Sequence, residues 1–528
     1  MSYTKRSRRR AGRTLTAIGA VAALVLAGCA ASENPEQDPA ESPTGDKGSD
    51  AIVEPRDFSI AVQSAPNSLD PAQVADGAQT FVWSSIMDTL LARDADTGDL
   101  IPNAAEDWSF NEDNTVLSLT LREGMTFSDE TPVDADAVAA SLERTRTTPG
   151  VVQAKYDQVT EIVAADDLTV EVHFERYDPQ FVENLALGAG AFGQPETLDE
   201  DRTDTDPVGS GPYTLDTAKT VPGTTYVLEK RDDYWNAEAI PFDTFTVQVI
   251  QDPTAALNAL QSGQVDGSTV QSQLVGQLDT EEFTLTEVPA TGVMVLDIID
   301  KSGREFPALG DKRVRQAINH AIDREGILNG YLNGNGQVTQ QIFNPDRDVY
   351  DETLNNTYDY DPELGKSMVE EAGYAGTTFE IPSTYLSQSF EPAVSEAFDS
   401  IGLNIDWVTV PPQQAQSAHL SGDYGMSFQI VGFNSDAADA FYHFGQGGFG
   451  NPLNYTDDAL DDAFAIINST NDETKTLPAY EDLNRYAVEE ALTVPILYVG
   501  STWAMRDGVS FSTIGGIPMT VRALGVGE

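Results

Sequence analysis

Few side chains in this sequence have the types and spacings that catalysis or metal binding requires. No cysteine nucleophile exists beyond residue 29, and no Gly-x-Ser-x-Gly motif is present. No two histidines are four residues apart, and none adjoins a carboxylate at a spacing typical of metal ligands, so we expect no zinc or nickel site. The histidines are His173, His320, His419 and His443. The sequence therefore predicts no enzyme, no cofactor and no metal site.

The single cysteine, Cys29, ends a segment with a different chemistry. A basic head with six Lys and Arg residues precedes an apolar run from about Leu15 to Ala27, which is typical of a secretory signal peptide. The ending Leu26-Ala27-Gly28-Cys29 resembles a bacterial lipobox, in which the cysteine sulfur is lipidated and the peptide is cut just before it. We therefore predict a signal peptide over residues 1–28 and a lipid anchor at Cys29. The arginine run could also direct export through the twin-arginine route, so Sec and Tat export both stay open.

The charge balance excludes several classes of partner. The sequence has 30 Lys and Arg against 85 Asp and Glu, and six of the basic residues lie in the predicted signal, which has no acid. The rest of the chain therefore has a net charge of −61, from 24 basic and 85 acidic residues. Nucleic-acid binding requires a basic surface, so we expect none. Residues 29–56 are rich in Glu, Asp, Pro and Ser and predict a disordered tether.

Helical and strand patterns alternate after the tether, which favours an α/β fold. Strands are predicted at 58–62, 117–121, 169–174, 245–250 and 403–407, and helices at 81–91, 134–142 and 253–262. The clearest helix is predicted from Asp311 to about Leu328, because Val314, Ala317, Ile318, Ala321 and Ile322 form one apolar stripe. Another helix is expected to begin at the cap Asp361 and to end at Gly373, with Leu364, Met368 and Val369 on its apolar face.

Several stretches, in a shared order over nearly the whole body, resemble the extracytoplasmic solute-binding proteins of family 5, which serve ABC importers. The matching stretches are NSLDP at 67–71, PNAAEDW at 102–108, LREGMTF at 121–127, GSGPY at 209–213 with Tyr234-Trp235 after it, LNALQSGQVD at 257–266, RVRQAINHAID at 313–323, and EAGY at 371–374. The most specific of these is the stretch at 313–323.

The resemblance implies a two-lobed periplasmic-binding-protein-like fold of type II (cluster C), with the first lobe enlarged and split in sequence. We expect the first lobe at 57–288, with an inserted subdomain at about 93–205. The second lobe is expected at 289–496, and residues 497–528 are expected to return to the first lobe. A ligand is enclosed between the lobes in this family.

The resemblance also indicates where the ligand binds. The family's second-lobe motif, roughly Gly-Trp-x-x-Asp-Tyr, reads here as Gly432-Phe433-Asn434-Ser435-Asp436-Ala437. In peptide-binding relatives this aspartate pairs with the ligand's α-amino group, and the neighbouring main chain pairs with the peptide backbone. A carboxylate in a low-dielectric cleft suits this role, because it forms a charge-assisted hydrogen bond with an ammonium group. The alternative for Asp436 is a solvated loop acid or a helix cap.

Other residues are expected near this aspartate. In the first lobe, Gly77 and Ala78 lie in the loop Asp76–Gln79, which matches a segment that touches the ligand by its main chain in relatives. The aromatic residues Phe433, Phe441, Tyr442 and Phe444 could stack on the ligand, although such a cluster is more often core. The glycine-rich stretch Gly445–Gly450 is expected to be only a flexible loop.

The region around the expected site lacks basic residues. No Lys or Arg occurs between Lys366 and Lys475, so this stretch offers no partner for a ligand carboxylate. We therefore expect a ligand with an amine or guanidinium that meets Asp436, and Asp439 as a second acid. The motif's Trp is Phe here and its Tyr is absent, so peptide and non-peptide solutes both stay open.

Together these patterns predict a monomeric, membrane-anchored, extracytoplasmic lipoprotein of an ABC importer. It would bind an oligopeptide or a dipeptide-like, amine-bearing solute and deliver it to permease subunits and their ATPase. The alternatives are import of a non-peptide solute, or a surface sensor or scaffold that uses the same fold without transport.

Overall fold

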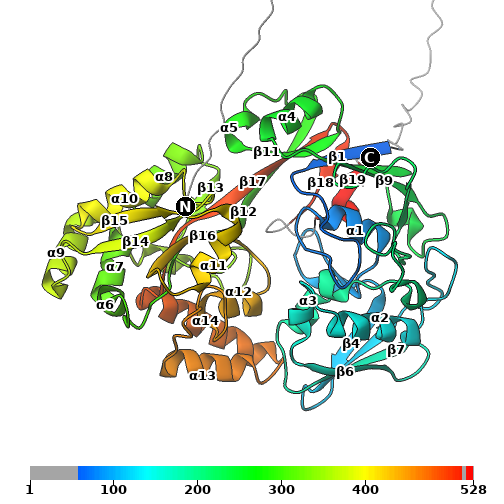
Figure 1. Ribbon diagram of the computed structural model, residues 1–528, viewed down its shortest axis with the longest axis horizontal. Helices are drawn as coiled ribbons and strands as arrows, with labels where there is room; N and C mark the ends of the chain where they lie inside the picture. The colour runs from blue at the N-terminus through cyan, green and yellow to red at the C-terminus, as the bar shows by residue number, and fades with distance from the viewer. Residues whose placement is uncertain (1–56, 514–518, 527–528) are drawn as a thin grey trace, which may run out of the picture. The chain divides into compact units, whose positions relative to one another are not determined.

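The computed structural model describes residues 57–513 and 519–526, so the predicted signal peptide and tether lie outside the described residues. Within that part of the chain the largest sheet has nine strands (Figure 1). Its order is β16 (Met426–Gly432), β12 (Phe283–Ile298), β17 (Thr493–Arg506), β11 (Gly267–Val270), β1 (Asp57–Val62), β10 (Thr244–Val249), β9 (Thr225–Lys230) and β8 (Tyr213–Leu215), and β13 (Gly336–Val338) also pairs with β17.

The other strands form smaller sheets. A four-stranded sheet has the order β4 (Ala105–Phe110), β5 (Val116–Leu121), β7 (Thr169–Phe174) and β6 (Val159–Ala164). The two-stranded sheets are β2 (Leu91–Arg93) with β3 (Leu100–Pro102), β14 (Thr378–Ser383) with β15 (Asn404–Thr409), and β18 (Val509–Phe511) with β19 (Leu524–Val526).

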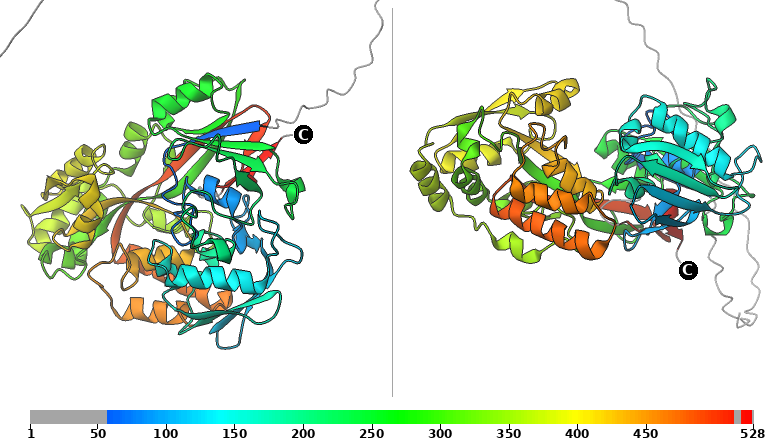
Figure 2. Two further views of the ribbon diagram at one scale, coloured as in Figure 1. Left: turned by 45° about the vertical axis from the view of Figure 1, so that its right-hand side comes forward. Right: turned by 90° about the horizontal axis from the view of Figure 1, so that it is seen from below.

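Helices cover these sheets, and Figure 2 shows α13 and α14, in orange, side by side in both views. The helices are α1 (Thr80–Ile86), α2 (Ala135–Thr147), α3 (Phe181–Asn184), α4 (Pro253–Gln261), α5 (Ser272–Val275), α6 (Pro307–Gly310), α7 (Lys312–Ala321), α8 (Arg324–Tyr331), α9 (Pro362–Ala372), α10 (Glu391–Ser400), α11 (Ala415–Leu420), α12 (Asp436–Phe444), α13 (Asp458–Ile467) and α14 (Glu473–Glu489).

Two long strands, β12 and β17, are shared by two hydrophobic cores. Near its start, β12 contributes Val288 to the core built around β1, β10 and α1, and near its end it contributes Met294 to the core that contains α7 and α10. We call the part around the former core the first lobe, and the part with α6 to α14 the second lobe. The expected lobe boundaries, at 288/289 and 496/497, fall inside these two strands.

The apolar stripe at 314–322 is buried as predicted, but the helix is shorter than expected. All five stripe residues are at most 1% exposed. The chain leaves the helix at Ile322, and Asp323 then caps the separate helix α8 by accepting a hydrogen bond from the Gly326 N–H, 2.8 Å. The guanidinium of Arg324 is buried and donates to the carbonyls of Asn319, Thr339 and Pro495, which fixes the break between α7 and α8.

Two further helix predictions need correction. The helix expected over 81–91 ends at Ile86, because the N–H of Leu91 instead donates to the carbonyl of Leu185, 3.1 Å, where β2 begins. The cap and the end of α9 are confirmed, but Leu364 is 44% exposed. Gly365 takes the inward position, because a side chain there would lie 2.9 Å from the Ala317 carbonyl oxygen.

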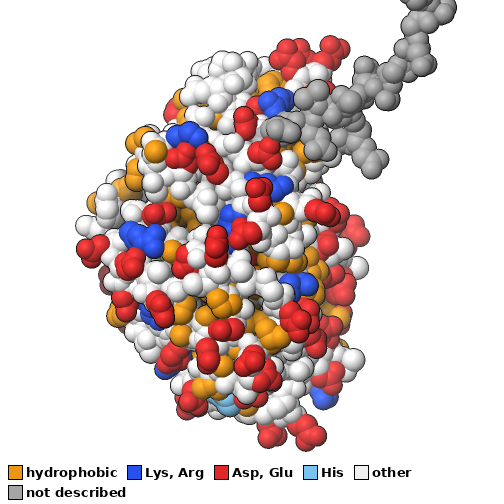
Figure 3. All heavy atoms as spheres, turned by 90° about the vertical axis from the view of Figure 1, so that its right-hand side faces the viewer, with side chains coloured by type: hydrophobic (Ala, Val, Ile, Leu, Met, Phe, Trp, Pro, Cys, Tyr) orange, Lys and Arg blue, Asp and Glu red, His pale blue; other side chains and the backbone are white. Residues whose placement is uncertain are grey.

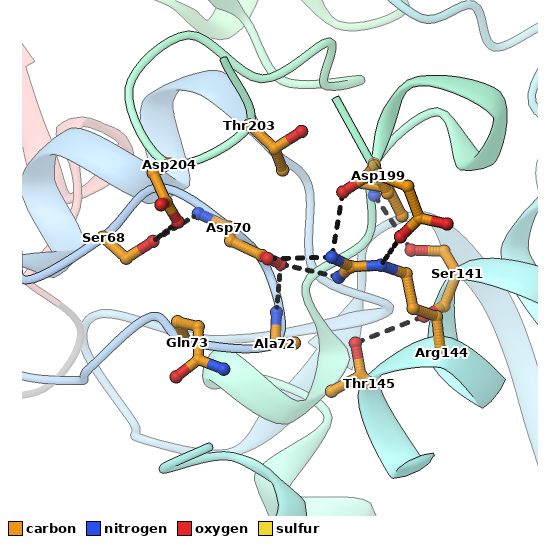
Figure 4. A network of polar contacts seen from close by, with 12 residues as sticks. Ser68, Asp70, Ala72, Gln73, Ser141, Arg144, Thr145, Asp199, Thr203 and Asp204 are labelled. Carbon is orange, nitrogen blue, oxygen red and sulfur yellow. Dashed lines mark hydrogen bonds and ion pairs between the residues drawn. The ribbon is translucent and has the colours of Figure 1, made fainter. Parts of the chain in front are cut away.

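An ion pair holds the start of the first lobe to α2. Arg144 donates to both carboxylate oxygens of Asp70, at 2.8 and 3.0 Å (Figure 4). The same guanidinium donates to Asp199, 3.0 Å, and to the carbonyl of Leu198, 2.9 Å. Asp70 also accepts from the Ala72 N–H, 2.9 Å. The NSLDP turn is thus fixed by a partly buried, bidentate pair that Lys could not reproduce.

The described surface is strongly acidic. Figure 3 shows Asp and Glu side chains spread over the face that it draws, with isolated Lys and Arg among them. Among the described helices, none has both the length and the apolar content that crossing a membrane requires.

We predict that Arg144→Ala lowers the free energy of unfolding by about 2 kcal/mol, because it leaves a partly buried carboxylate without its partner. Urea unfolding followed by tryptophan fluorescence measures this change. The matched control is Arg485→Ala, which removes an exposed pair with Asp482 and is expected to cost under about 1 kcal/mol. Equal losses in the two variants would contradict the role assigned to Arg144.

Candidate ligand-binding site

A cavity of about 630 Å³ is lined by residues of both lobes. Its walls are mostly apolar, with a few main-chain and polar groups, which is typical of a small-molecule site. The lining residues are Asp76, Gly77, Thr80, Ala186, Leu187, Met519 and Thr520 from the first lobe, and Thr291, Ile430, Val431, Gly432, Phe433, Asn434, Tyr442 and Phe449 from the second.

Strand β16 places three successive residues, Ile430 to Gly432, along this cavity. In the described sheet, β16 is the end strand and pairs only with β12. The two strands approach closely at Gly292, where a side chain would lie 2.3 Å from the Val431 carbonyl oxygen. An end strand beside a cavity offers main-chain groups to an extended ligand.

On the opposite side, Asp76 fixes the first-lobe loop that lines the cavity. One carboxylate oxygen accepts from the Gly188 N–H, 2.9 Å, and the other pairs with the Lys155 ammonium, 2.8 Å. The carbonyl of Gly77 accepts from the Thr80 N–H at the start of α1, 2.9 Å, and Gly77 has a positive φ of 98° that disfavours other residues. Asp76 is therefore already engaged by the protein.

Two acids project from the beginning of α12. Ser435 caps this helix through the Ala438 N–H, 3.2 Å, which places Asp436 at its first position and Asp439 one turn later. Asp439 is 5% exposed, and one of its oxygens accepts from the Asn434 N–H, 3.1 Å. Asp436 Oδ1 and Asp439 Oδ2 are buried and accept no hydrogen bond from any described residue.

Burial controls the ionisation of these acids. It raises the pKa of Asp436 to about 6, against the opposing effect of the nearby Arg347 guanidinium. Burial also raises the pKa of Asp439 well above its usual range, and the charge of Asp436 raises it further. When two neighbouring carboxyl groups are buried, ionisation of both at once is disfavoured by desolvation and by repulsion, unless a cation binds beside them.

Charged groups of both lobes surround the acids. Arg347 of the second lobe donates to the carbonyl of Gly98 in the first lobe, 3.5 Å. Arg93 donates to the same carbonyl, 2.9 Å, and pairs with Glu183 at 2.5 Å. Arg347 and Arg93 favour the ionised form of Asp436, whereas Glu183 disfavours it. The acids thus lie where charges of the two lobes meet.

The structure brings most of the predicted site residues together. Gly432, Phe433, Asn434 and Gly77 line the cavity, whereas Ala78 packs against the first-lobe core. Asp436 follows the cavity-lining segment but is not itself part of the lining. Their roles as ligand contacts stay predictions.

The aromatic cluster divides between cavity and core. Phe433 and Tyr442 line the cavity, Phe444 is buried in the core near α13 and α14, and Phe441 is 37% exposed. The sequence interpretation missed Phe449 because it lies in the glycine-rich stretch. It also missed Thr291, although the adjacent Gly292 inside an apolar strand signals a close approach of backbone.

Among the described residues, no group of three or more His, Cys, Asp or Glu side chains is arranged so that it could hold a metal ion.

The two lobes, the shared pair of long strands and the cavity between them define a two-lobed solute-binding protein. Residues 99–452 match the family described as bacterial extracellular solute-binding proteins, family 5 Middle. The chain therefore belongs to family 5 of the bacterial extracellular solute-binding proteins, the substrate-binding proteins of ABC importers.

Individual relatives are distant. The chain is 24% identical to the nickel-binding periplasmic protein of Escherichia coli K12 over 80% of this chain and 85% of that protein. It is 25% identical to heme-binding protein A of Haemophilus influenzae over 67% of this chain and 68% of that protein. A similar solved structure is the periplasmic binding protein DppA of Helicobacter pylori in complex with the peptide STSA. It has a TM-score of 0.73 and 21% identity, and it covers 89% of this chain and 98% of that one.

We predict that Asp436→Asn makes the protein more stable near neutral pH. The folded-state pKa of Asp436, about 6, lies above the ordinary value of 3.8. The wild-type carboxyl therefore contributes stability that is fully present below pH 3.8 and is lost as pH rises through about 6. The stability difference between Asp436→Asn and the wild type should grow by at most about 1.4 kcal/mol per pH unit between pH 3.8 and about 6. Thermal unfolding of both proteins between about pH 3.5 and 7 measures it, because the difference changes between pH 3.8 and about 6 and is constant above that range.

The control is Asp458→Asn, at an exposed position on α13. This variant should follow the wild-type pH profile. An Asp436→Asn profile parallel to that of the wild type would show that Asp436 is ordinarily solvated.

Proposed function

We propose that this protein binds an amine-bearing solute, an oligopeptide or a dipeptide-like compound, between its lobes and delivers it to the permease and ATPase of an ABC importer. The observation that carries the proposal is the pair of buried carboxylate oxygens on Asp436 and Asp439 without a hydrogen-bond donor among the described residues. A ligand ammonium would supply the missing donors and the missing positive charge.

The groups near Asp436 and Asp439 suit a ligand in which the cationic group is attached to an extended or apolar portion of the same molecule. The end strand β16 offers main-chain hydrogen bonds beside the acids, and the apolar walls suit a side chain. Arg347 and Arg93, which lie outside the Lys- and Arg-free stretch 367–474, bring positive charge to the same region. A ligand carboxylate could therefore be accommodated near the ammonium, as a dipeptide requires.

We predict that a free-amine peptide such as Ala-Phe binds, and that N-acetyl-Ala-Phe binds at least about 30-fold more weakly, because acetylation removes the charge that pairs with Asp436. In Asp436→Asn the free-amine peptide should lose a similar factor, and acetylation should then change little. Isothermal titration calorimetry of the four combinations measures this coupling.

Asp458→Asn again serves as the control and should bind as the wild type does. Unchanged affinity of Asp436→Asn for the free-amine peptide would refute the cation site. Native mass spectrometry of the protein as purified would identify a retained solute, and a solute without a cationic group would equally refute the proposal.

The proposal includes a lipid anchor, and it keeps the lobe division expected from the sequence. In this view residues 1–28 are removed, Cys29 is acylated, and residues 29–56 tether the lobes to the extracytoplasmic face of the cell membrane. The protein would then stay beside its permease as a monomer. Two acyl chains are enough for stable attachment, whereas one binds marginally.

We predict that Cys29→Ser moves the protein from the membrane fraction to the medium, because it removes the only sulfur that can be acylated. Cell fractionation and immunoblotting measure the shift. Ligand affinity of the released protein should equal that of the wild type, since Cys29 lies outside the binding lobes. Continued retention of Cys29→Ser in the membrane fraction would argue against the lipid anchor.

A further inference from the structure

A layer of buried titratable side chains lies directly behind the aromatic wall of the cavity. Asp297 on β12, Lys301 after β12, His419 on α11 and His443 on α12 are each at most 3% exposed. The proposed ligand chemistry uses none of them. Four such groups are costly to bury, so their contacts require an explanation.

His419 holds Phe449 in two ways. Its ring stacks on the Phe449 ring, with centroids 4.1 Å apart and planes 5° apart. Its Nε2 lies 2.8 Å from the Phe449 carbonyl oxygen, and its Nδ1 lies 3.1 Å from the Gln429 amide nitrogen. The carbonyl can only accept and the amide nitrogen can only donate, so His419 is the neutral tautomer with its proton on Nε2.

Lys301 holds the next carbonyl along the chain. Its ammonium donates to Gly450 O, 3.1 Å, and to Ile298 O, 2.8 Å. Asp297 lies among these groups and pairs with His443, 3.2 Å from Oδ1 to Nδ1. Two adjacent carbonyls behind the cavity wall are therefore each fixed by a buried basic side chain.

We propose that His419 and Lys301 are positioning residues for ligand capture, because they fix the main chain at 449–450 and thereby the Phe449 wall of the cavity. The proposal rests on the proposed function only for the identity of the ligand that contacts this wall. It assigns a role to two residues that do not line the cavity themselves.

A dependence on pH follows from the geometry of His419. Protonation would place an N–H on Nδ1, facing the amide donor of Gln429, so that hydrogen bond would be lost. Burial lowers the pKa of His419, Asp297 opposes this effect, and Lys301 and His443 add to it. The neutral form is thus favoured by folding. The stability contributed by the neutral His419 ring is fully present above the ordinary histidine pKa of 6.5 and is lost as pH falls through the lowered folded-state pKa.

Amide hydrogen exchange tests the proposal without a ligand. The N–H groups of Gly450 and Asn451 donate to Tyr442 O and Gly448 O, so they report on the order of this segment. In the wild type their protection factors should fall as pH decreases below about 6.5. His419→Ala should reduce protection at every pH. His419→Gln should retain protection and lose the pH dependence, because an amide can donate to the carbonyl without taking up a proton.

His173→Gln is the matched control, because His173 is half-buried on β7 of the first lobe and should leave the profile unchanged. Wild-type protection in His419→Ala, or a wild-type pH profile in His419→Gln, would overturn the proposal. If His419→Ala fails to fold, the comparison of wild type with His419→Gln still decides. Lys301→Met should also reduce protection of Gly450 and Asn451, and full protection in it would overturn the role of Lys301.

A second measurement addresses the cavity. If the wild type binds Ala-Phe, His419→Ala should weaken binding by about tenfold and His419→Gln by under about threefold; equal affinity of His419→Ala and wild type would overturn the positioning role in capture. If the wild type binds no Ala-Phe, the proposed ligand class has failed, and the exchange profiles alone decide whether His419 fixes the wall.

Discussion

The pairing of β12 with β17 is the constraint on which the rest of the structure depends. These strands supply apolar residues to both lobes, and the irregular pairing between Val288 and Gly292 falls where the cores meet. Thr291, at this irregularity, lines the cavity and donates to the Val499 carbonyl, 3.0 Å. The cavity wall is therefore part of the connection between the lobes. Any change in how the lobes approach must be absorbed near this point.

Electrostatics adds a second constraint, because charged groups are buried on both sides of the cavity wall. At α12, desolvation of Asp436 and Asp439 is only partly offset by arginines. Behind the wall, Asp297 Oδ1 lies 3.2 Å from His443 Nδ1, whereas Asp297 Oδ2 is buried without a hydrogen-bond donor among the described residues. In the first group, Asp436 Oδ1 and Asp439 Oδ2 have no donor among the described residues, which suits an incoming cation. In the second group, His419 and Lys301 contact the main-chain carbonyls of Phe449 and Gly450, which suits a rigid support.

Much of the fold could be predicted from the sequence, because local patterns and tertiary packing agree there. The stripe at 314–322 and the cap Asp361 are examples. Predictions failed where distant contacts overrode local preference. The helical pattern is interrupted at Arg324 because its guanidinium donates to carbonyls of other elements. Gly365 takes the inward position in place of Leu364, because α7 lies too close for a side chain there.

The parts of the candidate site that belong to a family motif could be predicted from the sequence. The parts that depend on a ring contact or on a hydrogen bond to a main-chain carbonyl could not. Gly432 to Asn434 and the loop at Gly77 lie at the cavity as the family resemblance implied. Phe449 was hidden among glycines, and its link to His419 joins residues thirty positions apart. Arg347 and Gly98 are further apart still, and no sequence pattern connects them.

The single cysteine has a practical consequence for measuring lobe motion. Because residues 30–528 contain no thiol, a pair of introduced cysteines would be the only reactive sulfurs in the binding lobes. Thr97 beside Gly98 and the exposed Asp346 beside Arg347 stand on opposite lobes next to the contact between them. Spin labels at these two positions would turn the approach of the lobes into a measured distance distribution, with no background from native thiols.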